Sequence, residues 1–424
     1  MKILLLTQLF QPEPNHLKGL AFAKELIARG HDVQVLTGFP NYPGGKFYKG
    51  YKIRPILKKK IEGVTVVRIP HYPSHGRSGF KRIASYISFA VCASIWGIFH
   101  IKKPDIVHVY QGPGTLAIPA VIMTWLWRVP FVLDIQDMWP ESALSSGMLR
   151  VPFASSILHA LSNWTCVHAR RIIVLSNGYK RVLMERGVSE SKIDVVYNWC
   201  LENQSKILST PLDEVFQKDN KLKIIYAGNL GPFQGLDTVI KAAQILHETE
   251  AQATFYLIGD GVQSDELKQL VYRSNVSNIK FIPRQTVSAI NRLMQQADAL
   301  LLHLKNDPLT CIGIPQKTQA YLFAGRPVLV GVNGECAEMV KEAGAGIAFE
   351  PEKPISLVNA VKKLSLMSEA DRNNIATNGK NFYHNKLSFA VGVARIEETF
   401  QRAINSDFQA LTAQRSGTFP SHNK

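Results

Sequence analysis

Short apolar runs rich in β-branched residues alternate with longer stretches of helical periodicity, and this alternation runs through the chain twice. Such an order is typical of parallel α/β domains, in which a helix crosses between neighbouring strands. The first series of predicted strands comprises Lys2–Leu6, Asp32–Leu36, Val64–Arg68, Ile106–Val109, Phe131–Asp134, Arg171–Leu175 and Ile193–Val196. The second series comprises Lys223–Tyr226, Ala253–Ile258, Ile279–Ile282, Ala299–Leu302, Pro327–Val330 and Gly346–Ala348.

The polar stretch Cys200–Leu222 separates the two series, and a length of 424 residues suits two domains of roughly 200 residues each. We therefore predict an α/β chain with a first Rossmann-like domain at 1–200 and a second at 201–385. A further amphipathic helix, Phe389–Ile404 within residues 386–406, is predicted to pack back on the first domain. The polar residues 407–424 are predicted to be a disordered tail.

The net charge of +16 is concentrated in the first domain. Residues 1–200 hold 25 Lys and Arg against 11 Asp and Glu, whereas the remaining residues hold 24 against 22. A basic domain favours a phosphorylated ligand or an anionic membrane surface as partner, and charge that serves only solubility is the alternative. No pattern of a nucleic-acid-binding motif occurs, so nucleic acid is not an expected partner.

The five cysteines are scattered without the CxxC spacing of a zinc site, and they indicate reduced thiols in a cytoplasmic protein. No clustered carboxylates or histidines suggest a bound metal, so we expect metal-independent chemistry.

One segment, Ile83–Ile101, holds 19 residues without a formal charge between Lys81–Arg82 and Lys102–Lys103. This length is close to that of a membrane span. A span would, however, place half of the first domain on the wrong side of the membrane. We therefore predict a crossover helix with one face on the sheet and an apolar face near lipid, anchored by the basic flanks. A wholly buried crossover helix remains the alternative.

In the first domain, two strand ends carry candidate chemistry. Lys18 and Gly19 lie where the first strand opens into a helix, and a phosphate could approach the free amides of that helix; an ordinary connecting loop is equally compatible. After the strand that ends near Asp134, the carboxylates of Asp137 and Glu141 could orient an acceptor hydroxyl. Capping of the following helix is an equal alternative for Asp137.

In the second domain, glycines follow two strands and would let backbone amides approach a diphosphate. The first turn holds Gly228, Asn229 and Gln234, and the second is Gly259-Asp260-Gly261. Ligands of open α/β sheets bind at the carboxyl ends of strands, so these two turns predict a shared crevice. Arg284 follows a third strand and could contact a nucleotide base, or it could be an ordinary surface charge.

The segment Cys311–Val328 predicts a loop that enters a helix near Gln316, with Lys317 and Thr318 in its first turn. A lysine is electrostatically unfavourable at a helix amino terminus unless an anion lies nearby. A ligand phosphate at Lys317 therefore explains the sequence better than chance does.

Taken together, these segments resemble glycosyltransferase family 4, retaining enzymes of the GT-B fold, over nearly the whole chain. The residues that carry the resemblance are Arg29–Thr37, Lys103–His108, the Gly228–Gly235 turn, Gly259–Gly261 and Gln319–Pro327. The segments Phe39–Pro43 and Asp137–Ser142 look most like bacterial O-antigen and capsule N-acetyl-L-fucosamine transferases. The resemblance implies a deep cleft between the two domains.

The resemblance also implies a function: transfer of a sugar from a nucleotide-sugar donor, a UDP-sugar, onto an undecaprenyl-diphosphate-linked acceptor. The enzyme would work without a cofactor, peripherally on the cytoplasmic face of the inner membrane. Asp137, Lys317 and Glu141 are the catalytic candidates, and Asn15, His16, Asn41 and Tyr42 are the acceptor-binding candidates. The donor-binding candidates are Lys18, Gly19, Gly228, Asn229, Gln234, Gly259, Asp260, Gly261, Arg284, Ile312, Gly313, Thr318 and Gln319.

The chain departs from the family pattern at two glutamates, which stand eight positions apart in relatives and are Ile312 and Ala320 here. Their roles toward the donor sugar and the ribose would fall to Gln319 and Lys317. The arginine and lysine that usually hold the diphosphate are replaced by Asn229 and Gln234. These departures leave two alternatives: a nucleotide-sugar 2-epimerase, or a non-catalytic scaffold of the same fold in a polysaccharide assembly complex.

Overall fold

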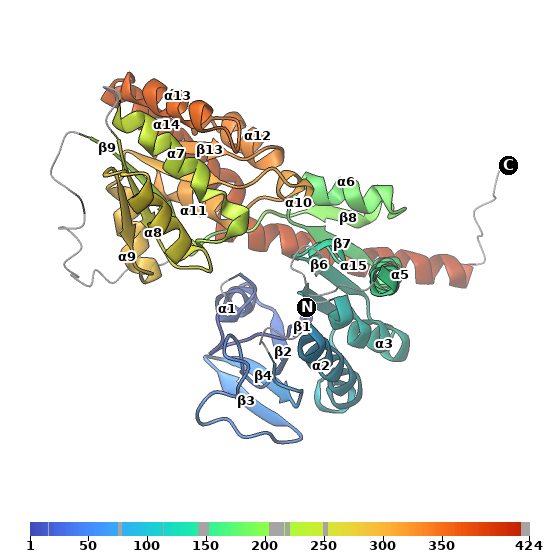
Figure 1. The fold of residues 1–424 in the computed structure, drawn as a ribbon. Coiled ribbons are helices and arrows are strands. Elements are labelled where there is room, and N and C mark those ends of the chain that lie inside the picture. The colour runs from blue at the N-terminus through green and yellow to red at the C-terminus, as the bar shows by residue number, and fades with distance from the viewer. Residues whose placement is uncertain are drawn as a thin grey trace. The chain divides into compact units, whose positions relative to one another are not determined.

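Two separate sheets organise the chain, and each belongs to its own compact unit (Figure 1). The N-terminal unit comprises Met1–Val196 together with the residues from Gly392 onward, and the C-terminal unit comprises Tyr197–Val391. This computed structural model describes residues 1–15, 17–74, 79–112, 114–142, 152–202, 216, 221–248 and 253–416. The chain thus passes from one unit to the other near residue 196, four residues before the predicted domain boundary, and returns at residue 392.

The N-terminal unit holds an eight-stranded sheet in the order β3-β4-β2-β1-β5-β6-β7-β8. Its strands are β1 (Lys2–Leu6), β2 (Asp32–Gly38), β3 (Leu57–Ile61), β4 (Val64–Ile69), β5 (Ile106–Gln111), β6 (Phe131–Ile135), β7 (Arg171–Val174) and β8 (Ile193–Val195). Its helices include α1 (Leu20–Ala28), α2 (Gly79–His100), α3 (Ile118–Trp127), α5 (Pro152–His168) and α6 (Asn177–Glu185). All seven predicted strands are present within two residues.

The strand β3 was not predicted, and its pairing with β4 is the only antiparallel pairing among the described strands of this sheet. Its sequence, Leu-Lys-Lys-Lys-Ile, has three consecutive lysines and therefore no alternation of apolar and polar residues. Lysines are common on edge strands because their charge blocks pairing with another chain. The missed strand is thus an edge strand that lacks the usual pattern.

Helices cover both faces of this sheet. In register, Leu5 lies beside Val35 and His108, and Phe22 of α1 contacts His108, so α1 covers that face. Leu36 points to the opposite face, and there it lies against Gly97 of α2, where an added Cβ would be 2.7 Å from a methyl group of Leu36. The helix α2 is therefore a crossover helix, as predicted.

The last helix, α15 (Phe389–Ser416), begins in the C-terminal unit and continues into the N-terminal one. There Glu397 accepts hydrogen bonds from Arg29 (3.2 Å) and His31 (3.0 Å), and the ring of Phe400 contacts His108. The helix thus packs on the first domain, but it is longer than predicted. The predicted disordered tail is wrong for residues 407–416, which continue the helix; residues 417–424 lie outside the described part.

The C-terminal unit holds a six-stranded parallel sheet in the order β11-β10-β9-β12-β13-β14. Its strands are β9 (Leu222–Ala227), β10 (Ala253–Ile258), β11 (Ile279–Ile282), β12 (Ala299–His303), β13 (Val328–Gly331) and β14 (Gly346–Ala348). Its helices are α7 (Leu236–His247), α8 (Ser264–Arg273), α9 (Val287–Gln295), α10 (Pro308–Ile312), α11 (Gln316–Ala324), α12 (Glu335–Glu342), α13 (Pro354–Ser365) and α14 (Glu369–Phe382). The six predicted strands are all present.

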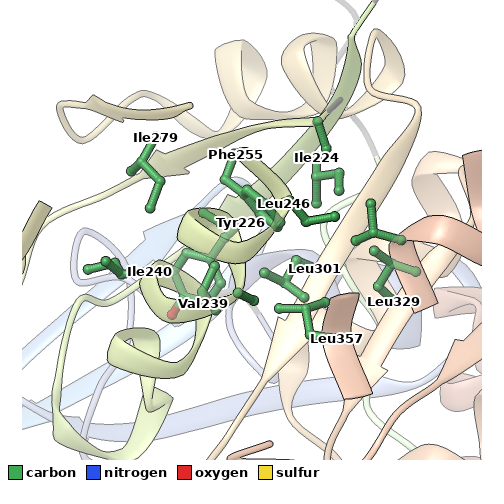
Figure 2. Close-up of a cluster of buried hydrophobic side chains, with 14 of the residues drawn as sticks. Ile224, Tyr226, Val239, Ile240, Leu246, Phe255, Ile279, Leu301, Leu329 and Leu357 are labelled. Atoms are coloured by element: carbon green, nitrogen blue, oxygen red, sulfur yellow. The ribbon is translucent and has the colours of Figure 1, made fainter. Parts of the chain in front are cut away.

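The core of this unit packs α7 and α13 against the strands. Figure 2 shows this cluster, in which Tyr226 of β9 lies among aliphatic side chains such as Val239 and Leu301. The ring of Tyr226 is fully buried, and its hydroxyl group lies at the carboxyl end of the strand, where it donates to the carbonyl oxygen of Asn229 (2.6 Å). The core and the first glycine turn are therefore joined through one side chain.

One described helix, α2, is long and apolar enough to cross a membrane by length and composition alone. In the structure it is two-faced: Phe89, Ala93 and Gly97 are buried on the sheet. The side chains exposed on α2 include Phe80, Ile87, Val91, Ile95, Trp96 and Phe99. The alternative of a wholly buried helix is therefore wrong, because apolar side chains along the whole length of α2 are open to solvent.

Candidate active site

The two glycine turns of the C-terminal unit touch each other at the carboxyl edge of its sheet. Gly228 follows β9 and Gly259 follows β10, with φ angles of 149° and 147°. A Cβ atom on Gly259 would lie 1.9 Å from the carbonyl oxygen of Gly228, and one on Gly261 would lie 2.3 Å from that of Leu230. Only glycine fits these positions, so the backbone forms a crevice edge with no side chain to keep a ligand away.

Lys317 lies directly on this edge. Its Nζ donates to the Tyr226 hydroxyl group and sits 3.9 Å from the centre of the Tyr226 ring. An added Cβ on Gly228 would lie 2.3 Å from its Cε atom. No carboxylate of the described residues lies within 4.0 Å of the ammonium group, and burial lowers the pKa of Lys317 to about 7. A lysine placed this way lacks a counter-ion, and an anionic ligand would supply one.

Asn229 and Gln234 shape the first turn. The side-chain oxygen of Gln234 accepts from the amide nitrogen of Asn229 (3.3 Å) and from the backbone nitrogen of Gly231 (3.1 Å). Both side chains are neutral, so the positive charge beside Gly228 comes from Lys317.

Around α10 and α11 the structure corrects two predicted donor-binding residues. Thr318 is fully buried, and its hydroxyl group contacts the Cys336 sulfur (3.2 Å). Gln319 is buried too, with its side-chain nitrogen oriented to donate to the carbonyl oxygens of Pro315 and Gln316, each at 3.0 Å. Neither side chain is open to a ligand, because both face the interior side of α11. Ile312 and Gly313 lie half-buried at the end of α10.

A cavity of ≈ 280 Å³ adjoins the second glycine turn. Gly259, Asp260, Lys268 and Arg284 all line it, so the structure brings Arg284 together with the Gly-Asp-Gly turn as the predicted crevice requires. Asp260 is exposed, and its Oδ1 accepts from the backbone nitrogen of Gly261 (2.8 Å). The cavity offers both charges and an aromatic wall, Phe281, which suits a nucleoside.

In the N-terminal unit, Lys18 does not face a ligand. Its side chain is buried, with Nζ 4.0 Å from Asp134, which also accepts a hydrogen bond from His108 (3.1 Å). Burial lowers the pKa of Lys18 to about 8. Burial alone would raise the pKa of Asp134, but Lys18 and His108 hold it below its usual value. The predicted donor-binding role of Lys18 is therefore wrong: its charge is paired inside the domain.

Gly19 caps α1, and an added Cβ would lie 2.1 Å from the carbonyl oxygen of Asn15. The side chain of Asn15 donates to the carbonyl of Leu9 (3.0 Å) and accepts from the nitrogen of Lys18 (3.1 Å), so it fixes the turn. His16 lies outside the described residues.

Asn41 and Tyr42 are held by a buried carboxylate, Glu13. Its Oε1 accepts from the backbone nitrogens of Asn41 (2.8 Å) and Tyr42 (2.9 Å). Burial raises the pKa of Glu13 above its usual value, although these hydrogen bonds oppose the rise. Asn41 and Tyr42 line a second cavity, of ≈ 350 Å³, at the carboxyl edge of this sheet. The structure therefore places two of the four acceptor candidates, Asn41 and Tyr42, in one cavity.

The two catalytic carboxylates of this unit have different surroundings. Asp137 lines the same cavity, and the surrounding protein raises the pKa of its carboxyl group. Glu141 is instead paired with the guanidinium group of Arg186. The ion pair engages Oε1 of Glu141, while Oε2 is buried without a partner among the described residues. Because Glu141 does not line the cavity and Asp137 does, the catalytic role predicted for Glu141 is corrected to a structural one.

We expect Asp137→Asn to lower the rate of sugar transfer by about three- to tenfold, the worth of one hydrogen bond to an acceptor hydroxyl group. The matched variant Glu141→Gln should lower Tm by a few degrees and leave the rate within about twofold, because it loses only the ion pair with Arg186. Initial rates and thermal unfolding of both variants check this. A larger rate loss in Glu141→Gln than in Asp137→Asn would reverse the assignment.

Sequence reasoning missed three residues of these sites: Tyr226, Arg82 and Trp139. Tyr226 reads as an ordinary core residue of a strand, and only the structure shows Lys317 on its ring. Arg82 was predicted to be a basic flank that anchors a helix, yet it lines the larger cavity together with Trp139. Arg82 lines the cavity because of the direction in which its side chain leaves α2. The apolar composition of this segment does not predict that direction.

Comparison with known families agrees with this geometry. Residues 20–199 match the glycosyl transferase 4-like domain, and residues 212–382 match the glycosyl transferases group 1 domain. The chain is 26% identical to the putative colanic acid biosynthesis glycosyl transferase WcaI of Escherichia coli, over 81% of this chain and 86% of that protein. It is 21% identical to the probable glycosyltransferase WbjE of Pseudomonas aeruginosa, over 62% and 66%.

Solved structures show the same fold. Anabaena HepE, solved in complex with UDP and glucose, is 18% identical and covers 95% of this chain and 99% of its own, with a TM-score of 0.64. A trehalose-6-phosphate structure from E. coli, bound with UDP-2-fluoro glucose, is 11% identical over 95% and 99%, with a TM-score of 0.71. Two Rossmann-like domains in this order are the common architecture.

Proposed function

Because the chain is a glycosyltransferase of the GT-B fold, built from a glycosyl transferase 4-like domain and a group 1 domain, we propose that it moves a sugar from a UDP-sugar onto a polyprenyl-diphosphate-linked acceptor. The donor half of this proposal is supported by Lys317, an ammonium group on the glycine edge of the C-terminal unit with no carboxylate of the described residues within 4.0 Å. Two structural relatives were solved with UDP or a UDP-sugar analogue, which supports a uridine nucleotide as donor.

The proposed reaction retains the configuration at the anomeric carbon. The acceptor hydroxyl oxygen bonds to that carbon from the face that the diphosphate leaves, while the carbon–oxygen bond to the diphosphate breaks. The departing diphosphate oxygen takes the hydroxyl proton, so no strong base is needed. Lys317 and the turn amides stabilise the charge that develops on the diphosphate, which lowers the barrier without a metal ion.

The proposed product belongs to O-antigen or capsule synthesis, with N-acetyl-L-fucosamine as a candidate for the transferred sugar. The segments Phe39–Pro43 and Asp137–Ser142 support that sugar, and the relative named for colanic acid biosynthesis supports a surface polysaccharide. The cytoplasmic face of the inner membrane is the proposed site of action, because polyprenyl-linked acceptors are lipids.

Mass spectrometry of a polyprenyl-diphosphate-linked glycan tests this function, after incubation with a panel of UDP-sugars in the presence of EDTA. We expect the acceptor to gain the mass of one sugar from one member of the panel. Proton NMR of the product should show the anomeric configuration of the donor. An epimerised free UDP-sugar without acceptor would instead identify an epimerase. Absence of donor binding by calorimetry would identify a scaffold, the alternative that Ile312 and Ala320 favour.

We further propose that the outer face of α2 contacts anionic lipid. Its exposed side chains Ile87, Val91 and Phe99 are apolar, and Trp125 of the neighbouring helix α3 is 63% exposed. The adjoining Lys81, Lys102 and Lys103 are exposed cations. This combination of apolar surface and positive charge is typical of an interfacial helix.

Co-sedimentation with liposomes that contain phosphatidylglycerol checks the contact. Binding should fall sharply as salt rises from 0.05 to about 0.5 M, because the lysine contribution is screened. Phe99→Ser together with Trp125→Ser should reduce binding at low salt as well. The control pair Tyr272→Ser and Ile355→Ser removes exposed apolar side chains from the C-terminal unit and should have no effect. Equal binding by both pairs would refute the assignment to α2.

A further inference from the structure

The larger cavity, in the N-terminal unit, is lined by groups of three chemical kinds. Tyr42, Tyr86, Tyr110 and Trp139 supply aromatic side chains. The polar and charged side chains of its lining include Asn41, Arg82 and Asp137. The remaining wall is mostly aliphatic or small. The volume of ≈ 350 Å³ is in the range of pockets that hold a small ligand.

Arg82 has unused hydrogen-bonding capacity here. Its Nε atom is buried and has no hydrogen-bond partner among the described residues, and its Nη2 atom makes only a long contact, 3.4 Å, with the Tyr86 hydroxyl group. No carboxylate among the described residues lies within 4.0 Å of its guanidinium group. A buried guanidinium nitrogen without a partner is unfavourable. An anion in the cavity would satisfy it, and guanidinium groups bind two oxygens of a phosphate at once.

The direction of Arg82 separates it from the lipid-facing residues of its own helix. On α2, Phe80, Ile87 and Val91 fall on one side by helical spacing, and Arg82 falls on the opposite side with the buried Phe89. Arg82 lines the cavity and its Nε atom is buried, whereas Lys81 is exposed. Its charge belongs to the cavity.

Asn41 restricts which ligand the cavity can bind. Both hydrogens of its side-chain amide are used, one toward the carbonyl oxygen of Phe39 (3.1 Å) and one toward Nε2 of His71 (2.8 Å). Burial lowers the pKa of His71 to about 4, so this ring is neutral, and its Nε2 accepts from Asn41 in the tautomer that carries its hydrogen on Nδ1. Only Oδ1 of Asn41 remains available, which means that the ligand must present a hydroxyl or amide hydrogen there.

The aromatic wall completes the set of requirements. The rings of Tyr86 and Trp139 pack edge to face with centroids 6.3 Å apart, so they hold each other in a fixed orientation. A rigid aromatic wall beside an amide oxygen and a carboxylate suits a pyranose ring, which has apolar faces and hydroxyl groups at its edge.

We propose that this cavity is the binding site for a sugar diphosphate, in which Arg82 binds a phosphoryl oxygen and Asn41 accepts a hydrogen bond from the adjoining sugar. This inference rests on the proposed function and adds to it. It states that the enzyme recognises two parts of the acceptor: the diphosphate between lipid and glycan, and the first sugar attached to that diphosphate. The lipid-linked acceptor is the assigned source of this chemistry, and a free nucleotide sugar is the competing source.

Calorimetric titration of the full-length protein separates the two sources. The probes are farnesyl-diphosphate-linked N-acetylglucosamine, the corresponding farnesyl monophosphate sugar, and UDP-N-acetylglucosamine. We expect Arg82→Gln to weaken binding of the farnesyl diphosphate probe at least tenfold, as for loss of a charge-assisted hydrogen bond, with little effect on the UDP-sugar. Arg82→Lys should recover part of the affinity, and the monophosphate should bind less tightly than the diphosphate.

Arg181→Gln is the matched control, because it removes the same charge from an exposed side chain of α6 in the same unit. A Tm measurement shows whether each variant is folded. If Arg82→Gln weakens the UDP-sugar instead, or weakens neither ligand while the wild-type protein binds both, the assignment is overturned. Binding that depends on Arg82 in a protein that transfers no sugar would sustain this site and refute only the proposed function.

Discussion

Replacement of Lys317 by alanine or methionine is expected to lower the rate of sugar transfer at least tenfold while the protein stays folded. Lys317 is the cation on the glycine edge of the C-terminal unit, above Tyr226 and against Gly228. Its charge offsets the charge that develops on the departing diphosphate, and the neutral Asn229 and Gln234 cannot replace it. Each factor of ten corresponds to roughly 1.4 kcal/mol of transition-state stabilisation.

The same substitution should stabilise the fold. Burial lowers the pKa of Lys317 to about 7 from an ordinary value of 10.5, so between these values the unfolded chain binds a proton that the folded protein does not. The free energy of unfolding of the wild-type protein therefore gains from rising pH across this window. Lys317→Met removes the cost of burying the charge, and its advantage in Tm should be largest below pH 7 and shrink toward pH 10.5.

Donor binding is a third measurement. Its affinity should fall as pH rises, whereas the free energy of unfolding of the wild-type protein should increase. A diphosphate binds the protonated ammonium group, so affinity for the UDP-sugar should weaken as pH rises above about 7 in the wild-type protein. Lys317→Met should bind weakly at every pH, and Tyr226→Phe should retain most of the dependence because it keeps the charge. Wild-type turnover in Lys317→Met would remove this residue from the mechanism.

The second large effect is expected from Gly259→Ala. The added Cβ would lie 1.9 Å from the carbonyl oxygen of Gly228, and the φ angle of 147° is one that residues with a side chain rarely adopt. Both strands that bear the glycine turns are central to the sheet, so the backbone has no room to move aside. We expect a loss of at least about 3 kcal/mol in the free energy of unfolding, which is at the upper end for single substitutions.

Urea unfolding of Gly259→Ala checks this value, with Gly44→Ala as control. Gly44 has no atom within 4 Å of its would-be Cβ and no positive φ angle, so alanine there should be neutral. Gly228→Ala has a similarly unfavourable φ angle of 149°, but its added methyl group would meet the flexible end of Lys317 and not a backbone atom. It should therefore lose less stability than Gly259→Ala and should also weaken donor binding. A Gly259→Ala protein as stable as Gly44→Ala would show that the turns separate easily.

The sheet strands could be predicted from sequence because parallel strands are buried on both faces and appear as short continuous apolar runs. The edge strand at Leu57–Ile61 could not, since its three lysines face solvent and give no pattern. The end of α15 was missed for a related reason. Polar residues after Ile404 look like a tail in composition, although their helix continues to Ser416.

For the candidate site, glycines were more predictable than polar side chains. The turns at Gly228 and Gly259 lie together because a glycine that follows a parallel strand is confined to one edge of the sheet. The direction of a side chain is set by packing, which the sequence does not reveal. Lys18 lies in the loop that follows a parallel strand, as these glycines do, yet its ammonium group is buried beside Asp134 and does not face a ligand. Gln319 was predicted to bind the donor, but its side chain is buried inside the C-terminal unit.

The last helix of the chain has a consequence for biosynthesis. Phe400 contacts His108, and Glu397 binds Arg29 and His31, so contacts of the first-made domain depend on residues translated about 290 to 370 codons later. During translation, the surface of α1 and β5 that contacts α15 stays exposed to solvent until the carboxyl-terminal half has been synthesised. Truncation by a premature stop codon anywhere before α15 would therefore damage the domain at the opposite end of the message.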